Sequence, residues 1–197
     1  MGLYLDLKLE YSLPSMRNWA ASPDFLLKIS RLSENIEGNI LECSCGVSTI
    51  VLAQRLKLNG KGHVFSLEHD PLFADKTKQE LQRHNLLDWA TIITAPLVKY
   101  SIGGGEHFWY SLDLLPKHIS VDMIVIDGPP AHIGKLARYP AGPLLFHRLK
   151  NGGIIALDDS DRDDEKEVVS KWLHEFKDYE ALNVDCEKGC VLLVSKA

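Results

Sequence analysis

Carboxylates end four of the five central apolar stretches in this sequence, and they are the side chains best suited to chemistry. The stretches NILECS, GHVFSLE, VDMIVID and GGIIALD finish at or near Glu42, Glu68, Asp127 and the pair Asp158-Asp159. A carboxylate beside a buried strand is costly unless it is solvated, paired or bound to a ligand. Because parallel strands present their carboxyl ends at one edge of a sheet, these acids predict a polar site there.

Three of these acids form a candidate cation site. Asp127, Asp158 and Asp159 should end adjacent strands, where like charges repel unless they are solvated, protonated or bridged by a cation. All-oxygen ligands favour Mg²⁺, Ca²⁺ or Mn²⁺ over zinc. The alternative is a structural network in which the aspartates pair with Arg138 or Arg162. The sequence leaves both interpretations open.

The stretch ILECSCGVST, residues 40–49, is typical of a strand, a tight turn and a helix, which is the order of elements in a nucleotide loop. Only Gly46 remains of the usual glycines, and Ser44 stands where an earlier one is expected. A serine suits that position only if its φ is negative or its side chain avoids the ligand. Ser48 and Thr49 suit helix capping better than ligand contact, although Ser48 is kept as a candidate.

Glu68 follows Gly46 at a spacing that suits nucleoside binding. An acid ending the second strand, about 20 residues after the loop, can accept hydrogen bonds from both ribose hydroxyls and would repel a 2′-phosphate. His69 follows this acid and is a candidate for the same pocket. His132 follows Asp127 and is a candidate general base, although a loop histidine is more often only exposed.

Alternating apolar and helical segments must position these residues. Strands are predicted at 39–44, 62–68, 90–95, 121–127 and 152–158, and helices at 24–36, 48–58, 71–85, 138–150 and 162–176. Segments 180–186 and 190–195 predict a C-terminal hairpin. The pattern predicts an α/β fold, a Rossmann-like doubly wound and mostly parallel sheet of about seven strands with an antiparallel C-terminal hairpin strand. Residues 101–118, with three glycines, are expected to form a surface loop or a mobile pocket wall.

Composition indicates an ordinary globular protein. The 197 residues are 45% hydrophobic and 25% charged, with a net charge of -5 and a pI of about 5.9. These values predict one domain at 24–197 after an N-terminal extension at 1–23, and no general affinity for nucleic acid. No stretch has the length and character of a signal peptide or a membrane span, so we expect a cytoplasmic location. The four cysteines are expected to be reduced thiols.

The order of these motifs resembles that of the class I S-adenosylmethionine-dependent methyltransferases. The loop follows the pattern E-x-G-x-G-x-S-T with serine in place of the first glycine. Within that superfamily the chain is most similar to a bacterial group with the motifs IDGPP, RYPA, and DD followed by R, which here are residues 126–130, 138–141 and 158–162. The similarity spans about residues 24–195 and includes features of methyltransferase family 24.

The resemblance implies a binding site for S-adenosylmethionine. Backbone around Cys43 to Gly46 would line the methionine portion, Glu68 would hold the ribose, and the turn at Ala95, Pro96 and Leu97 would edge the adenine. Asp127 would contact either the amino group of the cofactor or a cation. The complete set of expected cofactor-binding residues is Glu42, Cys43, Ser44, Cys45, Gly46, Ser48, Glu68, His69, Ala95, Pro96 and Asp127.

The resemblance also implies the reaction. The acid trio is similar to that of catechol and caffeoyl-coenzyme-A type O-methyltransferases, in which a divalent cation such as Mg²⁺ binds a substrate hydroxyl. We therefore expect methyl transfer to a hydroxyl oxygen of a small molecule, with Asp127, Asp158 and His132 as catalytic candidates. The alternatives are a non-catalytic module of the same fold and a nicotinamide-dependent oxidoreductase. No membrane partner is expected, and a homodimer is left open.

Overall fold

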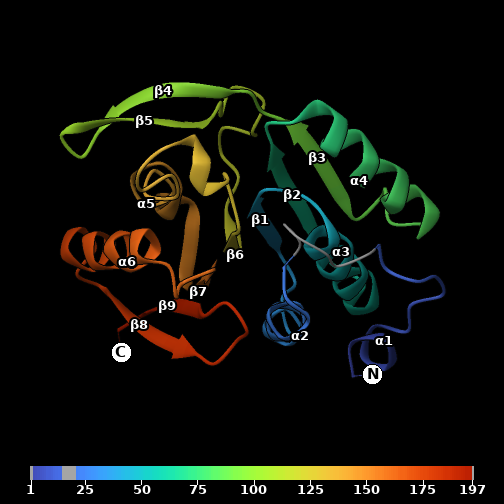
Figure 1. Cartoon of the computed structure of the whole chain (residues 1–197). Helices are drawn as coiled ribbons and strands as arrows, with labels where there is room; N and C mark the ends of the chain where they lie inside the picture. The colour runs from blue at the N-terminus through green and yellow to red at the C-terminus, as the bar shows by residue number, and fades with distance from the viewer. Residues whose placement is uncertain (1, 15–20, 197) are drawn as a thin grey trace.

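The computed structural model describes residues 2–14 and 21–196. Its main sheet has seven strands, and the expected Rossmann-like, mostly parallel sheet with an antiparallel C-terminal hairpin is confirmed (Figure 1). From one edge to the other, the strands are β3 (Ala90–Thr94), β2 (His63–Glu68), β1 (Asn39–Cys43), β6 (Val121–Ile126), β7 (Leu149–Asp158), β9 (Cys190–Ser195) and β8 (Tyr179–Val184).

Helices cover both faces of this sheet (Figure 1). One core contains side chains from α1 (Gly2–Leu7), α2 (Pro23–Leu32), α3 (Val47–Asn59) and α4 (Pro71–Arg83). The other contains side chains from α5 (Ala141–Leu145) and α6 (Asp163–Glu175). The winding reverses between β1 and β6, which pair in parallel, so the carboxyl ends of these strands flank the place where ligands bind in open α/β sheets.

The helix predicted at 138–150 is shorter than expected. The structure has α5, then the 3₁₀ turn η2 (Phe146–Arg148), after which β7 begins. Gly142 and Pro143 are both poor helix formers, which accounts for the short α5. A Cβ atom at Gly142 would lie 2.4 Å from Nε1 of Trp172, so the glycine permits close packing of α6.

The segment predicted as a loop at 101–118 is largely a β-hairpin, which corrects the sequence interpretation. Strands β4 (Leu97–Ile102) and β5 (Gly105–Tyr110) pair antiparallel through a two-residue turn. Gly103 and Gly104 have φ values of 59° and 76°, as hairpin turns of this length require. The glycines therefore close a turn rather than loosen a loop, and Trp109 and Tyr110 are fully buried.

The N-terminal residues that the structure describes pack on the sheet domain. Leu3 and Leu7 of α1 are buried, and Asp6 pairs with Arg55 of α3 at 2.7 Å. Residues 15–20 of the predicted extension lie outside the described residues, and the boundary at residue 23 remains a prediction. Within residues 2–14 and 21–196, no helix is both long and apolar enough to cross a membrane.

Candidate active site

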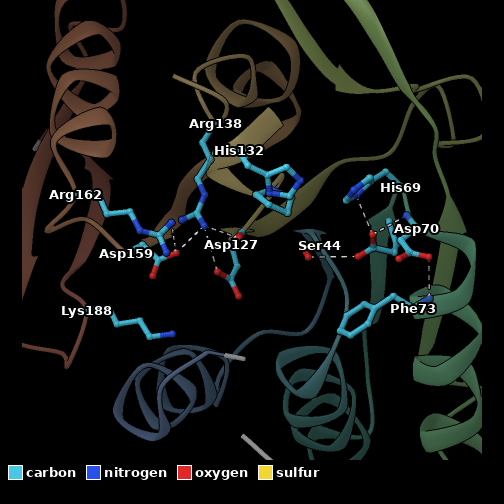
Figure 2. Close-up of a pocket in the computed structure, with 12 residues that line it drawn as sticks. Ser44, His69, Asp70, Phe73, Asp127, His132, Arg138, Asp159, Arg162 and Lys188 are labelled. Atoms are coloured by element: carbon cyan, nitrogen blue, oxygen red, sulfur yellow. Dashed lines mark hydrogen bonds and ion pairs between the residues drawn. The ribbon is translucent and has the colours of Figure 1, made fainter. Parts of the chain in front are cut away.

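A cavity of about 380 Å³ lies beyond the carboxyl ends of β1, β2, β6 and β7. Its lining forms two groups that face each other across the pocket (Figure 2). The loop group comes from the ends of β1 and β2 and the start of α4, and consists of Ser44, Glu68, His69, Asp70 and Phe73. The acid group comes from the segment between β6 and α5, the loop between β7 and α6 and the turn between β8 and β9, and consists of Asp127, Pro130, His132, Arg138, Asp159, Arg162 and Lys188.

Ser44 adopts the backbone conformation of the glycine it replaces. Its φ is 84°, so the first of the two conditions stated for a serine here, a negative φ, is not met, and a non-glycine residue in this region is strained. The hydroxyl Oγ turns toward Glu68 and donates a hydrogen bond to Oε2 at 3.3 Å. Gly128 makes room for the side chain, because a Cβ atom at Gly128 would lie only 2.6 Å from Cβ of Ser44.

Glu42 supports the loop from beneath. Oγ1 of Thr49 donates to Oε2 of Glu42 at 2.5 Å and accepts from the backbone N–H of Gly46 at 2.9 Å. The capping role expected of Thr49 is thereby confirmed. Burial raises the pKa of Glu42 to about 7, against hydrogen bonds that lower it. Glu42 therefore acts on the loop through Thr49, and it does not line the cavity.

Glu68 is buried at the centre of the loop group, with donors around both carboxylate oxygens. Oε2 accepts from Oγ of Ser44 at 3.3 Å and from the backbone N–H of Cys45 at 3.2 Å. Oε1 accepts from the backbone N–H of Asp70 at 2.9 Å and lies 3.0 Å from Nδ1 of His69. Two of these four neighbours are side chains that can turn away, whereas the backbone donors are fixed.

Several residues expected at the cofactor lie outside the cavity lining among the described residues. These are Glu42, Cys43, Cys45, Gly46, Ser48, Ala95 and Pro96. Gly46 is nevertheless at the edge, because a Cβ atom there would lie 3.6 Å from the ring of Phe73. Burial raises the pKa of the Cys43 and Cys45 thiols, so both stay protonated. Their roles as cofactor contacts remain predictions.

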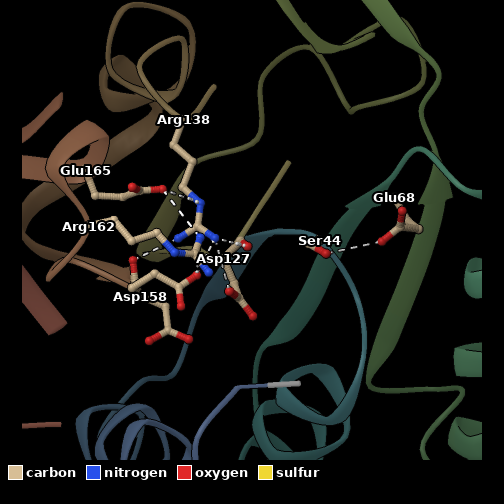
Figure 3. A network of polar contacts seen from close by, with 8 residues as sticks. Ser44, Glu68, Asp127, Arg138, Asp158, Arg162 and Glu165 are labelled. Carbon is tan, nitrogen blue, oxygen red and sulfur yellow. Dashed lines mark hydrogen bonds and ion pairs between the residues drawn. The ribbon is translucent and has the colours of Figure 1, made fainter. Parts of the chain in front are cut away.

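The acid trio does come together, and it surrounds a buried arginine (Figure 3). One carboxylate oxygen from each of Asp127, Asp158 and Asp159 lies within 4.8 Å of the others. Nη2 of Arg138 donates to Oδ2 of Asp159 at 2.7 Å and to Oδ1 of Asp127 at 3.5 Å. Arg162 adds a second guanidinium contact to Oδ2 of Asp159, at 2.9 Å.

The aspartates differ in their electrostatic surroundings. Asp158 is fully buried, and neither of its carboxylate oxygens has a hydrogen-bond partner among the described residues. Burial, with the neighbouring charge of Asp159, raises the pKa of Asp158 to about 6. Burial and the charge of Asp158 also raise the pKa of Asp127 well above its ordinary range, although Arg138 opposes the shift. Protonation of Asp158 therefore relieves part of the repulsion as the pH falls through about 6.

The trio fits a divalent cation only partly. Its all-oxygen chemistry is suitable, and the oxygens of Asp158 are unengaged. However, Asp159 already accepts from two guanidinium groups, and Arg138 lies between Asp159 and Asp127. A divalent ion would have to approach or displace a fixed positive charge. The residues present therefore do not fit the ion well, and the expected Mg²⁺ remains a prediction.

Some cavity residues were not expected from the sequence. His132 lines the pocket as expected, from the 3₁₀ turn η1 (Ala131–Ile133), but Phe73 and Lys188 were not proposed as site residues. Lys188 lies in the turn between β8 and β9 and reaches the pocket only because β9 pairs with β7. Phe73 is three residues after Asp70, which caps α4. Its short distance in sequence from Glu68 was the feature that could have predicted a place in the cavity.

Comparisons with known structures support the assignment of the fold. An S-adenosylhomocysteine-bound methyltransferase of Podospora anserina, PaMTH1, is 15% identical, with a TM-score of 0.67 over 91% of this chain and 81% of that chain. An O-methyltransferase of Bacillus cereus in complex with S-adenosylhomocysteine is 22% identical, with a TM-score of 0.66 over 93% and 84%. TomG of Streptomyces achromogenes, an O-methyltransferase in tomaymycin synthesis, is 16% identical, with a TM-score of 0.67 over 100% and 87%.

The sequence comparisons give the family. No curated protein sequence matches this chain. A family profile described as a methyltransferase domain matches residues 41–160, which is more than half of the chain. This range includes the Ser44 loop, Glu68 and the acid trio. The chain therefore belongs to this methyltransferase-domain family, and its sheet has the Rossmann-like fold of the class I S-adenosylmethionine-dependent methyltransferases.

Proposed function

We propose that this protein transfers the methyl group of S-adenosylmethionine to a hydroxyl oxygen of a small molecule. The observation that carries the proposal is the shared cavity, in which the loop group with Glu68 faces the acid group with Asp127 (Figure 2). A nucleoside held by Glu68 would extend across the Ser44 loop toward the acids. The cavity volume of about 380 Å³ is in the range of small-molecule sites. Two of the structural neighbours bind S-adenosylhomocysteine, and two are described as O-methyltransferases, which supports this proposal.

The reaction requires the protein mainly to position the two reactants. The acceptor oxygen forms a bond to the methyl carbon while the carbon–sulfur bond breaks, and the sulfonium becomes a neutral thioether. The proton of the hydroxyl leaves to a base, for which Asp127, Asp158 and His132 are the candidates. The chain would thus bind both molecules in line and receive one proton, and orientation accounts for much of the rate.

Calorimetric titration with S-adenosylhomocysteine and, separately, with NADH tests the cofactor. We expect saturable binding of S-adenosylhomocysteine and no binding of NADH. Binding of NADH alone would replace the proposal with a nicotinamide-dependent oxidoreductase, and binding of neither would favour the non-catalytic module. Incorporation of labelled methyl groups into a panel of small hydroxyl compounds then tests the acceptor class.

Glu68→Gln should weaken S-adenosylhomocysteine binding about tenfold. The carboxylate can accept from both ribose hydroxyls, whereas the amide has one accepting oxygen, and a hydrogen bond to a charged group contributes about 1.5–3 kcal/mol. The measurement is the same titration. Glu106→Gln is a matched control, because Glu106 is exposed in β5 and pairs with Lys99 away from the cavity. Unchanged affinity in Glu68→Gln would show that the ribose does not lie at this acid.

Ser44→Gly should strengthen S-adenosylhomocysteine binding by about three- to tenfold. The Ser44 hydroxyl occupies Oε2 of Glu68, so a ribose hydroxyl must displace it at the cost of about 0.5–1.5 kcal/mol. Glycine also adopts the observed φ of 84° without strain. Ser44→Ala is the control, because it removes the hydroxyl but keeps Cβ. Weaker binding in both variants would mean that the serine contacts the ligand directly.

A further inference from the structure

We propose that Arg138 is the resident cation of the acid trio, and that it positions the aspartates for methyl transfer without a divalent metal. The inference rests on the proposed function, because the trio matters for catalysis only if the acceptor binds beside it. It departs from what the sequence resemblance implies, namely a metal ion at Asp127, Asp158 and Asp159. The contacts of the guanidinium support it (Figure 3).

The guanidinium joins the ends of two neighbouring strands. Nη1 donates to the backbone carbonyl of Asp158 at 2.8 Å, and Nη2 donates to the backbone carbonyl of Asp127 at 2.6 Å. Nη2 also contacts the side chains of Asp127 and Asp159. On the other side, Nε lies 3.5 Å from Oε1 of Glu165. The two Nη atoms of the planar guanidinium thus donate to oxygens at the carboxyl ends of β6 and β7.

Burial makes this cation a permanent part of the site. The Arg138 side chain is 3% exposed, and its charge cannot be removed by deprotonation in the working range of pH. The position is fixed by two carbonyl oxygens that do not depend on ionisation of the aspartates. A metal ion binding the trio would sit within a few ångströms of this charge, and the repulsion is weakly screened in a buried site.

Arg138 offsets part of the negative charge of the surrounding carboxylates. Asp127, Asp158, Asp159 and Glu165 carry up to four negative charges, and Arg138 and Arg162 supply two positive charges. Lys188 adds a third positive charge, which acts on Asp158. Asp159 has a φ of 56°, a strained conformation that its two guanidinium partners help to hold. Arg138 is therefore a positioning residue: it holds Asp159 and the backbone of Asp127 while the Asp127 side chain lines the cavity.

Electron paramagnetic resonance of Mn²⁺ tests this assignment without an acceptor substrate. We expect no saturable Mn²⁺ binding by the wild-type protein up to millimolar concentrations. Arg138→Met should gain Mn²⁺ affinity by at least about tenfold, because a positive charge is lost beside oxygen ligands. Adding Asp158→Asn to that variant should abolish the gain. Arg148→Met is the matched control, because within residues 2–14 and 21–196 Arg148 donates only to the carbonyls of Pro116 and Lys117.

Two results would overturn the proposal. The first is saturable Mn²⁺ binding by the wild-type protein that Asp158→Asn removes. The second is a folded Arg138→Met variant with no gain in Mn²⁺ binding, since a merely structural arginine would leave the metal affinity unchanged. If Arg138→Met does not fold, Arg138→Gln serves the same test, because its amide can still donate to one of the two carbonyl oxygens.

Titration of the wild-type protein with S-adenosylhomocysteine, with and without Mg²⁺, distinguishes a failure of this inference from a failure of the proposed function. S-adenosylhomocysteine should bind with the same affinity in EDTA and in Mg²⁺. A lack of S-adenosylhomocysteine binding would contradict the proposed function, whereas the Mn²⁺ titrations concern only the trio. An affinity for S-adenosylhomocysteine that requires Mg²⁺ and is lost in Asp158→Asn would contradict the resident arginine.

Discussion

Arg138→Met should lower the free energy of unfolding by about 3–5 kcal/mol at pH 8, the typical cost of removing one partner from a buried ion pair. The arginine is 3% exposed and contacts carboxylates of Asp127, Asp159 and Glu165. Without it, these charges remain buried with Arg162 as the neighbouring cation, and Arg162 is itself 41% exposed. The carbonyl oxygens of Asp127 and Asp158 also lose their donor.

The loss of stability in Arg138→Met should become smaller as the pH falls. Burial and mutual repulsion raise the pKa of Asp127 and Asp158 in the folded protein, and Arg138 opposes both shifts. Its removal raises these pKa values further. Because an acid with a raised folded-state pKa stabilises the fold when it is protonated, the deficit of Arg138→Met should shrink as the pH falls from 8 to 5.

Urea denaturation at both pH values measures this effect. Arg148→Met provides the control, because its donor contacts are to backbone carbonyls outside the acid trio. Its stability relative to the wild-type protein should therefore change little between the two pH values. A deficit of equal size at pH 8 and pH 5 would show that packing of the arginine stem and its hydrogen bonds to the carbonyls, rather than its attraction to the carboxylates, stabilise the fold.

Asp158→Asn should raise the free energy of unfolding by about 2 kcal/mol at pH 8. The fully buried carboxylate has no hydrogen-bond partner among the described residues. The rise of its pKa from 3.8 to about 6 corresponds to about 3 kcal/mol of lost stability above that pH. The asparagine amide must also be desolvated, which offsets part of the gain.

The size of this stabilisation should also depend on pH. Stability linked to Asp158 is fully present below its unfolded pKa and is lost as the pH rises through about 6. Asp158→Asn should therefore have little effect near pH 4 and stabilise the protein at pH 8. The same denaturation series checks this. Destabilisation at pH 8 would mean that the ionised carboxylate has a favourable partner.

A buried carboxylate that destabilises the fold and has a raised pKa is a candidate for a functional role. We therefore expect Asp158→Asn to lower methyl transfer on an identified acceptor while leaving S-adenosylhomocysteine binding intact. Full turnover in this variant would assign Asp158 a purely structural place in the cluster. The stability measurement and the turnover measurement are independent of each other.

Local patterns predicted most of the elements in this protein. Apolar runs bounded by glycine, aspartate or proline predicted all of the parallel strands, because such runs can be buried on both faces. The hairpin β4–β5 was missed, since its glycines suggested a flexible loop. None of the residues of β4 is fully buried, so this strand lacks the apolar pattern of the others. The deciding feature was the positive φ at both Gly103 and Gly104, which only the folded chain displays.

The sequence by itself determined the succession of parallel strands along the chain, the Gly46 loop, the position of Glu68 and the gathering of Asp127, Asp158 and Asp159 at one edge. These follow from chain-local periodicity and from the rule that parallel strands end together. Only the tertiary structure showed that Arg138 contacts these acids. Arg138 is 11 residues from Asp127 and 21 from Asp159, and it meets both because the turn before α5 directs it across the ends of β6 and β7. The direction of a buried side chain depends on packing from every neighbouring element, which no local pattern specifies.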